Sequence, residues 1–164
     1  MSSPNVCTGI IGRRIIEPYF FVRNVTSEAY LDFLQNKLPE LVKDIPFTIR
    51  RNFIFQQDGA PAYFRRQVRD FLNDNYQGRI GRGELIAWPP RSPDLTSLDF
   101  YLWSHIKSVV YSEEITGFDQ LKERISFALN QLKQQNTLEN VHRNLVRKAQ
   151  LCIRQNGQHL QQFL

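Results

Sequence analysis

The most informative segment for the fold is Asn52-Phe53-Ile54-Phe55-Gln56-Gln57-Asp58-Gly59-Ala60-Pro61. Its first six residues are typical of a short strand, and Asp58-Gly59 is a turn signal. An amphipathic helix is predicted directly after the turn, with these apolar residues on one face: Phe64, Val68, Phe71 and Leu72. A carboxylate between a strand and the next helix is where open α/β sheets place ligand-binding groups. The stretch therefore predicts an α/β fold with a polar site at the end of this strand.

The elements predicted on either side agree with an α/β order. A hairpin is expected first, with its turn at Gly12-Arg13, and a helix begins after the capping residue Thr26. A loop is expected over Gln77–Gly83, then a short strand over Glu84–Trp88 and a helix from Leu98 onward. Two helices are predicted for the remainder, so the chain divides into residues 1–116 and a C-terminal helical extension over 117–164.

Composition excludes several classes of protein. The 164 residues are 41% hydrophobic and 23% charged, which is typical of a globular domain rather than a disordered chain. Two cysteines are too few for a disulfide-rich scaffold, and neither has partners at zinc-ligand spacing. No apolar run approaches the roughly 18 residues of a membrane span, so we expect no membrane partner. The first residues lack a signal-peptide pattern, and we expect a reducing compartment.

The positive charge is concentrated in one part of the chain. The net charge is +5, and the segment from Lys122 to Arg154 holds seven cations and two anions, so it accounts for the whole excess. Clustered cations favour a polyanionic partner, although a solvated helical face is an equally good interpretation. We therefore name three residues of this segment as candidate nucleic-acid contacts: Arg143, Arg147 and Lys148.

Three acids are candidates for chemistry. Asp58 follows the strand, and Asp94 and Asp99 flank the start of a later helix. Carboxylates at a strand end and on a nearby helix are suitable ligands for one hard divalent cation. Each residue also has an ordinary structural interpretation, because Asp58 fits a turn and Asp94 fits a helix N-cap.

The predicted loop between the two strands adds basic residues. Backbone amides and arginines in Gly78-Arg79-Ile80-Gly81-Arg82-Gly83 suit a phosphate, although a plain surface loop is the simpler interpretation. Arg91 lies between this loop and Asp94. We include Arg79, Arg82 and Arg91 among the candidate nucleic-acid contacts.

Two motifs resemble a known family. Gln56-Gln57-Asp58-Gly59-Ala60-Pro61 and Trp88-Pro89-Pro90-Arg91-Ser92-Pro93-Asp94-Leu95 with the following Thr96-Ser97-Leu98-Asp99 resemble the catalytic domain of mariner/Tc-like transposases. The resemblance extends from about Asn5 to about Tyr111 and is looser beyond Gly117. It implies a ribonuclease-H-like fold, with Mg²⁺ or Mn²⁺ held by the three acids of a DDE/DDD site. In this pattern Asp58 matches the second acid, Asp99 the third, and Asp94 a structural cap.

The chain also departs from the family pattern. The family's first acid lies on a central strand upstream of the segment that begins at Asn5, and no counterpart of that strand is predicted here. Tyr63 stands where family members often have histidine. We therefore expect a partial ribonuclease-H-like fold with a gap in its sheet, N-terminally truncated and inactive as it stands.

The resemblance implies DNA as the partner, transposon ends in the ancestral enzyme, and the nucleus as the compartment. A homodimer is a further candidate state. The alternative function is that of a non-catalytic remnant that binds nucleic acid or protein.

Overall fold

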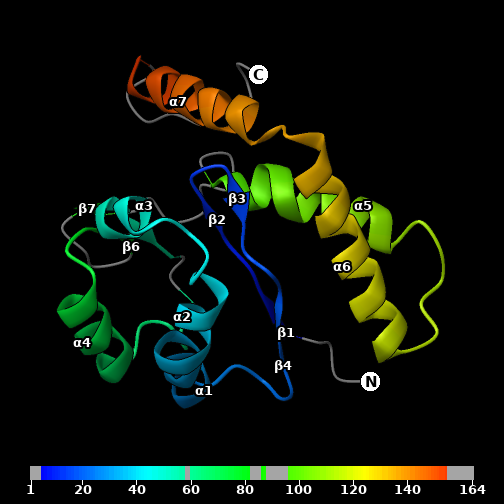
Figure 1. Cartoon of the computed structure of the whole chain (residues 1–164), viewed down its shortest axis with the longest axis horizontal. Coiled ribbons are helices and arrows are strands. Elements are labelled where there is room, and N and C mark those ends of the chain that lie inside the picture. Colours follow the sequence, from blue (N-terminus) through cyan, green and yellow to red (C-terminus); the bar gives the residue numbers. More distant parts are fainter. Residues whose placement is uncertain (1–4, 58–59, 82–85, 88–95, 155–164) are drawn as a thin grey trace. The chain divides into compact units, whose positions relative to one another are not determined.

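A computed structural model describes residues 5–57, 60–81, 86–87 and 96–154. The chain forms two compact units, one from residues 1–7 and 19–91 and the other from residues 8–18 and 92–164. Figure 1 shows the elements of both units along the sequence. The boundary predicted between residues 116 and 117 falls within the second unit and stays a prediction.

The predicted N-terminal hairpin forms, in two short antiparallel ladders. β1 (Asn5–Cys7) pairs with β4 (Tyr19–Phe21), and β2 (Ile10–Ile11) pairs with β3 (Arg14–Ile15). Gly12 occupies the turn with φ of 58°, a conformation that glycine adopts without steric cost.

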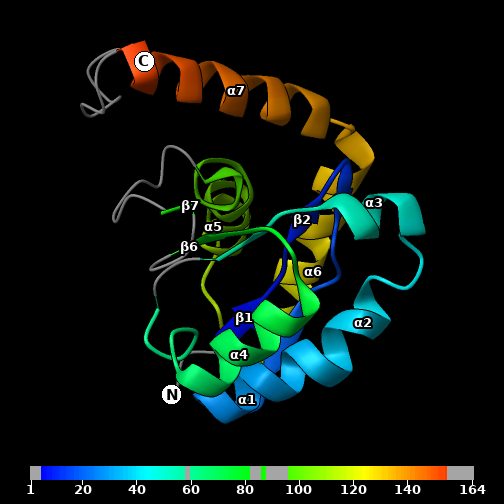
Figure 2. The same ribbon diagram turned by 90° about the vertical axis from the view of Figure 1, so that its left-hand side faces the viewer.

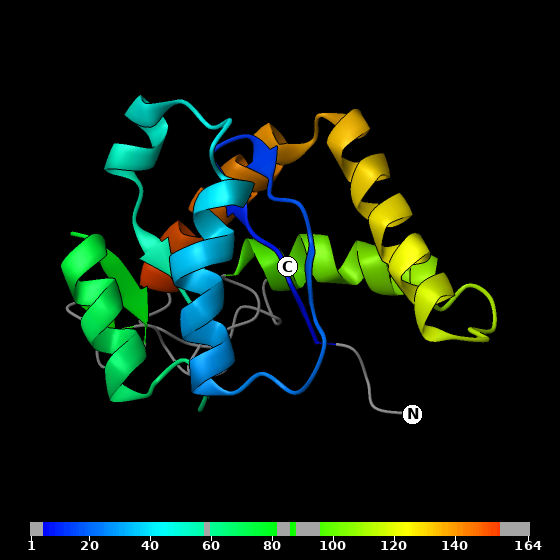
Figure 3. The same cartoon turned by 60° about the horizontal axis from the view of Figure 1, so that its bottom comes forward.

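The first unit contains helices packed around aromatic side chains. α1 (Ser27–Asp32), the π-helical turn η1 (Phe33–Lys37) and α2 (Leu38–Leu41) form one continuous rod, followed by α3 (Phe47–Asn52). The hydroxyl of Thr26 accepts a hydrogen bond from the backbone N–H of Ala29 at 3.2 Å, so Thr26 is the N-cap of α1 as predicted. α1 packs against α4 (Arg66–Asn75), as Figure 2 and Figure 3 show.

A small parallel sheet carries the motif strand, in the order β5 (Phe55–Gln56), β6 (Arg79–Gly81) and β7 (Ile86–Ala87). The prediction of a loop over Gln77–Gly83 is therefore wrong for Arg79–Gly81, which form a strand. The backbone N–H of Phe55 donates to Gly78 O at 2.9 Å and that of Gln57 to Ile80 O at 3.2 Å, and these non-local bonds hold the segment as a strand. Within the described residues β5 is an edge strand, and the hairpin does not pair with it.

The described residues of the second unit form the hairpin tip and four helical segments. The π-helical turn η3 (Leu98–Trp103) leads into α5 (Ser104–Val110), which crosses α6 (Phe118–Gln135) as seen in Figure 1. α7 (Leu138–Arg154) leaves α6 in a new direction because Asn136 ends α6 in the left-handed conformation, with φ of 49°. Fully buried leucines form the core of this unit: Leu102, Leu129 and Leu132. Among the described residues, no helix has the length and apolar character that crossing a membrane requires.

Candidate nucleic-acid interface

α7 is an amphipathic helix with a basic outer side. Leu138 and Val141 are buried on its inner side, whereas Arg143 and Arg147, two of the candidate nucleic-acid contacts, are exposed. Arg154 is also exposed. Because an α-helix turns about 100° per residue, these three arginines lie within about 40° of one another on one face. We call Arg143, Arg147 and Arg154 the basic face.

Arg154 was missed by sequence reasoning as a candidate contact. Its signal was the seven-residue spacing from Arg147, which places both residues on one helical face.

The only acid in α7, Glu139, is at its beginning and is paired. Its Oε2 lies 3.4 Å from Nη2 of Arg13, which is in the turn between β2 and β3. An exposed ion pair of this kind adds little stability, but it balances the charge of Glu139. The basic face therefore keeps its net positive charge along the helix.

Lys148 differs from the two arginines with which it was predicted. It is only 7% exposed, and its Nζ lies 4.1 Å from the centre of the Phe100 ring. Val146 and Arg147, the two residues before Lys148, are both exposed. A lysine whose ammonium lies against an aromatic ring has little surface left to offer a phosphate.

Asp99 lies near the beginning of η3 and is exposed. Its backbone N–H donates to Thr96 O at 2.9 Å, and its carbonyl accepts from Ser104 Oγ at 3.0 Å. A π-helical turn is rare and often occurs at functional sites. Asp99, which was predicted to match the third acid of the family pattern, therefore lies on a hydrogen-bonded backbone at the surface of the second unit.

Asp58, Asp94, Arg82 and Arg91 lie outside the described residues, so their predicted roles stay predictions. Arg79 is described and lies in β6, where its Nη2 donates to Asn73 Oδ1. This bond turns one edge of the guanidinium towards α4.

The residues next to Asp58 are well anchored. Tyr30, 4% exposed on α1, donates its hydroxyl to Gln57 Oε1 at 3.1 Å. The ring of Tyr30 lies 4.1 Å from that of Tyr63, centre to centre, and the Tyr63 N–H donates to Ala60 O at 3.0 Å. Tyr63, which stands where the family often has histidine, is thus part of an aromatic pair. No local sequence signal links Tyr30 to Gln57, because they are far apart in the sequence.

The described residues alone do not form a metal centre. They contain no group of three or more His, Cys, Asp or Glu side chains that could hold a metal ion. Asp58 and Asp99 are carboxylates of the type that Mg²⁺ and Mn²⁺ prefer, but only Asp99 is described, and a single exposed carboxylate binds a hydrated cation weakly.

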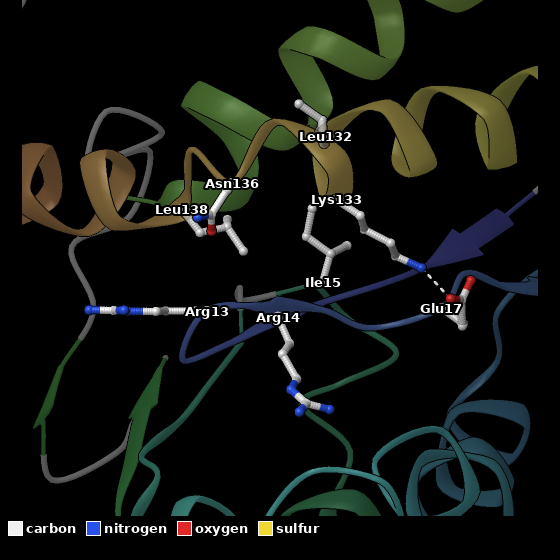
Figure 4. Close-up of a pocket in the computed structure, with 8 residues that line it drawn as sticks. All are labelled: Arg13, Arg14, Ile15, Glu17, Leu132, Lys133, Asn136 and Leu138. Atoms are coloured by element: carbon white, nitrogen blue, oxygen red, sulfur yellow. Dashed lines mark hydrogen bonds and ion pairs between the residues drawn. The ribbon is translucent and has the colours of Figure 1, made fainter.

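A cavity of about 360 Å³ lies between the hairpin tip and the junction of α6 with α7. Its apolar lining residues are Ile15, Leu132 and Leu138, all of which are buried. In Figure 4 the side chains of Arg13 and Arg14 point away from each other, and Lys133 points to its ion-pair partner Glu17. Because these charged groups do not converge, the cavity is no evident ligand site.

Curated relatives of the chain are transposases. It is 28% identical over 99 residues to the Transposable element Tcb2 transposase of Caenorhabditis briggsae, covering 58% of this chain and 33% of that protein. It is 27% identical over 104 residues to the Tc3 transposase of Caenorhabditis elegans, covering 63% of this chain and 29% of that protein. A comparison with protein-family models finds no match.

Solved structures give the fold. The catalytic domain of Mos1 transposase with Raltegravir and Mg superposes with a TM-score of 0.64 at 18% identity, over 95% of this chain and 76% of that one. The chain is thus similar in sequence to Tc-type transposases and similar in fold to the Mos1 catalytic domain. The predicted ribonuclease-H-like fold is thereby confirmed.

A second structure, the Mos1 mariner paired end complex with Mn, superposes with a TM-score of 0.53 at 20% identity, over 74% of this chain and 38% of that one. The chain spans about a third of the length of the curated relatives it matches.

Proposed function

We propose that this chain is a transposase-derived domain that binds DNA through the basic face of α7. The observation that carries the proposal is the line of exposed arginines on one side of α7, with its single acid paired to Arg13. The paired end complex of Mos1, a structural neighbour, supports DNA as the partner.

The geometry of the basic face suits the DNA backbone rather than the bases. Arg143 and Arg147 are four residues apart, about 6 Å along the axis of α7, so both can face one DNA backbone. Arginine binds phosphate through a planar fork of N–H donors. Phosphate contacts fix position but carry no sequence information, so we expect weak binding without sequence preference.

Fluorescence anisotropy with a labelled duplex at several salt concentrations tests the proposal. Each lost phosphate contact should reduce the slope of log affinity against log salt by about 0.9. We expect the slope to fall by about twice this amount in the Arg143→Ala/Arg147→Ala double variant, which lacks two arginines of the basic face. Arg66→Ala is the matched control, because Arg66 is an exposed arginine of the first unit that already pairs with Asp70 at 3.5 Å. An unchanged slope in the double variant would show that α7 is not the contact.

We further propose that Asp58 and Asp99 are the carboxylates that approach a divalent metal in this domain. The motif match and the Mos1 catalytic-domain structures with Mg and Mn support this role. Paramagnetic broadening of backbone NMR signals by Mn²⁺ tests it without requiring any activity. We expect broadening centred on residues near position 99, and its loss in Asp99→Asn. Equal broadening in wild type and variant would remove Asp99 from the site.

The ancestral chemistry, cleavage and strand transfer of DNA in the nucleus, belongs to the same proposal. The alternative is a remnant that binds nucleic acid without catalysis. The two differ in the Mn²⁺ experiment, because a remnant has no reason to place a cation at Asp99.

A further inference from the structure

Helix α7 is attached to the helical turn that carries Asp99. Lys148 projects from the inner side of α7, and its ammonium lies over the ring of Phe100, the residue that follows Asp99. A cation over an aromatic face is stabilised by the ring quadrupole, and more strongly when water is excluded. Lys148 is 7% exposed, so this contact is largely shielded.

A second contact lies at the beginning of α7. The hydroxyl of Tyr101 makes a hydrogen bond with the hydroxyl of Thr137, the residue that precedes α7. Phe100 and Tyr101 are adjacent in η3, whereas Lys148 and Thr137 are separated by most of α7. Two contacts so far apart along α7 hold η3 in both position and direction.

We propose that Lys148 is a positioning residue that couples the DNA-binding helix α7 to η3, and that it is not itself a DNA contact. DNA on the basic face would then lie in a fixed relation to Asp99. This inference rests on the proposed DNA binding by α7 and deepens it.

The helical geometry separates the two roles. Lys148 follows Arg147 directly and so projects about 100° away from it, onto the inner side of the helix. The Arg147 side chain is exposed and the Lys148 side chain is buried, as this rotation requires. One side therefore meets the partner while the other holds η3.

Coupling of this kind has a measurable consequence. If α7 and η3 open together, a ligand that stabilises α7 must also slow the local opening of η3. We expect duplex DNA to slow amide hydrogen exchange in Leu98–Trp103 severalfold in the wild-type chain. The loss of a contact between a cation and an aromatic ring should speed exchange in the free chain by roughly threefold to thirtyfold.

Three variants separate positioning from direct contact. Lys148→Met keeps the buried aliphatic stem and removes the cation. The effect of DNA on η3 exchange should then be lost, whereas the salt slope should differ from that of wild type by less than about half the value for one phosphate contact. Lys148→Arg restores a cation over the ring and should restore the effect. Arg147→Ala is the neighbouring control, and it should reduce the salt slope by about 0.9 with free-chain exchange in η3 unchanged.

A second route avoids any change in α7. Phe100→Leu removes the aromatic face but keeps an apolar side chain, and it should abolish the DNA effect on η3 exchange as Lys148→Met does. If Lys148→Met reduces the salt slope by a full contact and leaves η3 exchange unchanged, Lys148 is a DNA contact and the inference is wrong. If the wild-type chain binds no DNA, the proposed function fails, and the free-chain exchange of Lys148→Met still decides whether Lys148 holds η3.

Discussion

At the scale of single residues, the hydrogen bond between Tyr30 and Gln57 lies directly beside the motif. A buried tyrosine normally finds a partner for its hydroxyl, because an unmade hydrogen bond in the interior is costly. Here the partner is the side chain of the residue that precedes Asp58. The contact therefore links the packing of α1 to the end of the motif strand.

We expect Tyr30→Phe to lower the free energy of unfolding by about 1 kcal/mol, the usual net value of one such hydrogen bond. The phenyl ring still packs on Tyr63, so the loss is confined to the hydroxyl. Chemical denaturation measures the change. Tyr111→Phe is the control, because Tyr111 is 74% exposed and its variant should stay within about 0.5 kcal/mol of wild type. A double variant with Gln57→Leu should be less destabilised than the sum of the single variants, since both remove one bond.

Tyr76 makes the stability of the folded chain depend on pH in the alkaline range. Burial raises the pKa of its phenol above the ordinary value of 10.0. The unfolded chain therefore loses this proton first, and the contribution of Tyr76 to stability is present below about pH 10 and is lost as the pH rises through the folded pKa. We expect Tyr76→Phe to show a shallower fall in stability between about pH 9 and about pH 11. Denaturation midpoints across this range test it, and parallel curves would contradict it.

At the scale of elements, Arg124 of α6 holds the connection from α5. Its Nη1 donates to the carbonyls of Val110 at 3.0 Å and Glu113 at 2.9 Å, and its Nη2 to the Glu113 carboxylate at 2.7 Å. The side chain is only 15% exposed, so these bonds are partly shielded from water. One guanidinium thus closes the end of α5 and the start of the loop onto α6.

We expect Arg124→Ala to destabilise the chain by about 2–3 kcal/mol, the cost of leaving shielded carbonyls without a charged donor. Arg124→Lys should recover only part of this, because an ammonium cannot reproduce the planar fork. Thermal and chemical unfolding provide the measurement. Arg143→Ala, on the exposed side of α7, is the control and should change the free energy of unfolding by less than about 0.5 kcal/mol. A lysine variant as stable as wild type would show that charge alone accounts for the contact.

At the scale of the whole molecule, the edge of β5 that is unpaired in the described part of the chain favours association between copies of the chain. Within the described residues β5 bonds only to β6, and Ile54 beside it is 52% exposed. Free strand edges promote association, and natural proteins often protect them with charge.

We expect the chain to associate as its concentration rises, and Ile54→Lys to reduce this association by placing a charge beside the edge. Light scattering after size exclusion measures the mass at several concentrations. Phe127→Lys, at a 57% exposed site on helix α6, is the matched control and should leave association unchanged. Equal reduction by both variants would indicate a general effect of charge instead of the strand edge.

Local sequence patterns were enough to predict the N-terminal hairpin, the cap at Thr26 and the buried face of α4 that contains Val68 and Leu72. These features follow from local spacing, because the period of apolar residues specifies which side of an element is buried. The two motifs also identified the family resemblance, and with it the fold that the Mos1 structures confirm.

Contacts between residues that are distant in the sequence are visible only once the chain is folded. Arg79 lies in a strand because β5 supplies parallel backbone partners from distant residues. Lys148 is withdrawn from the basic face because Phe100 lies beneath it, and Tyr30 anchors Gln57 across a long sequence separation. Periodicity along a chain contains no record of such non-local contacts, whose energies depend on distance and burial in space.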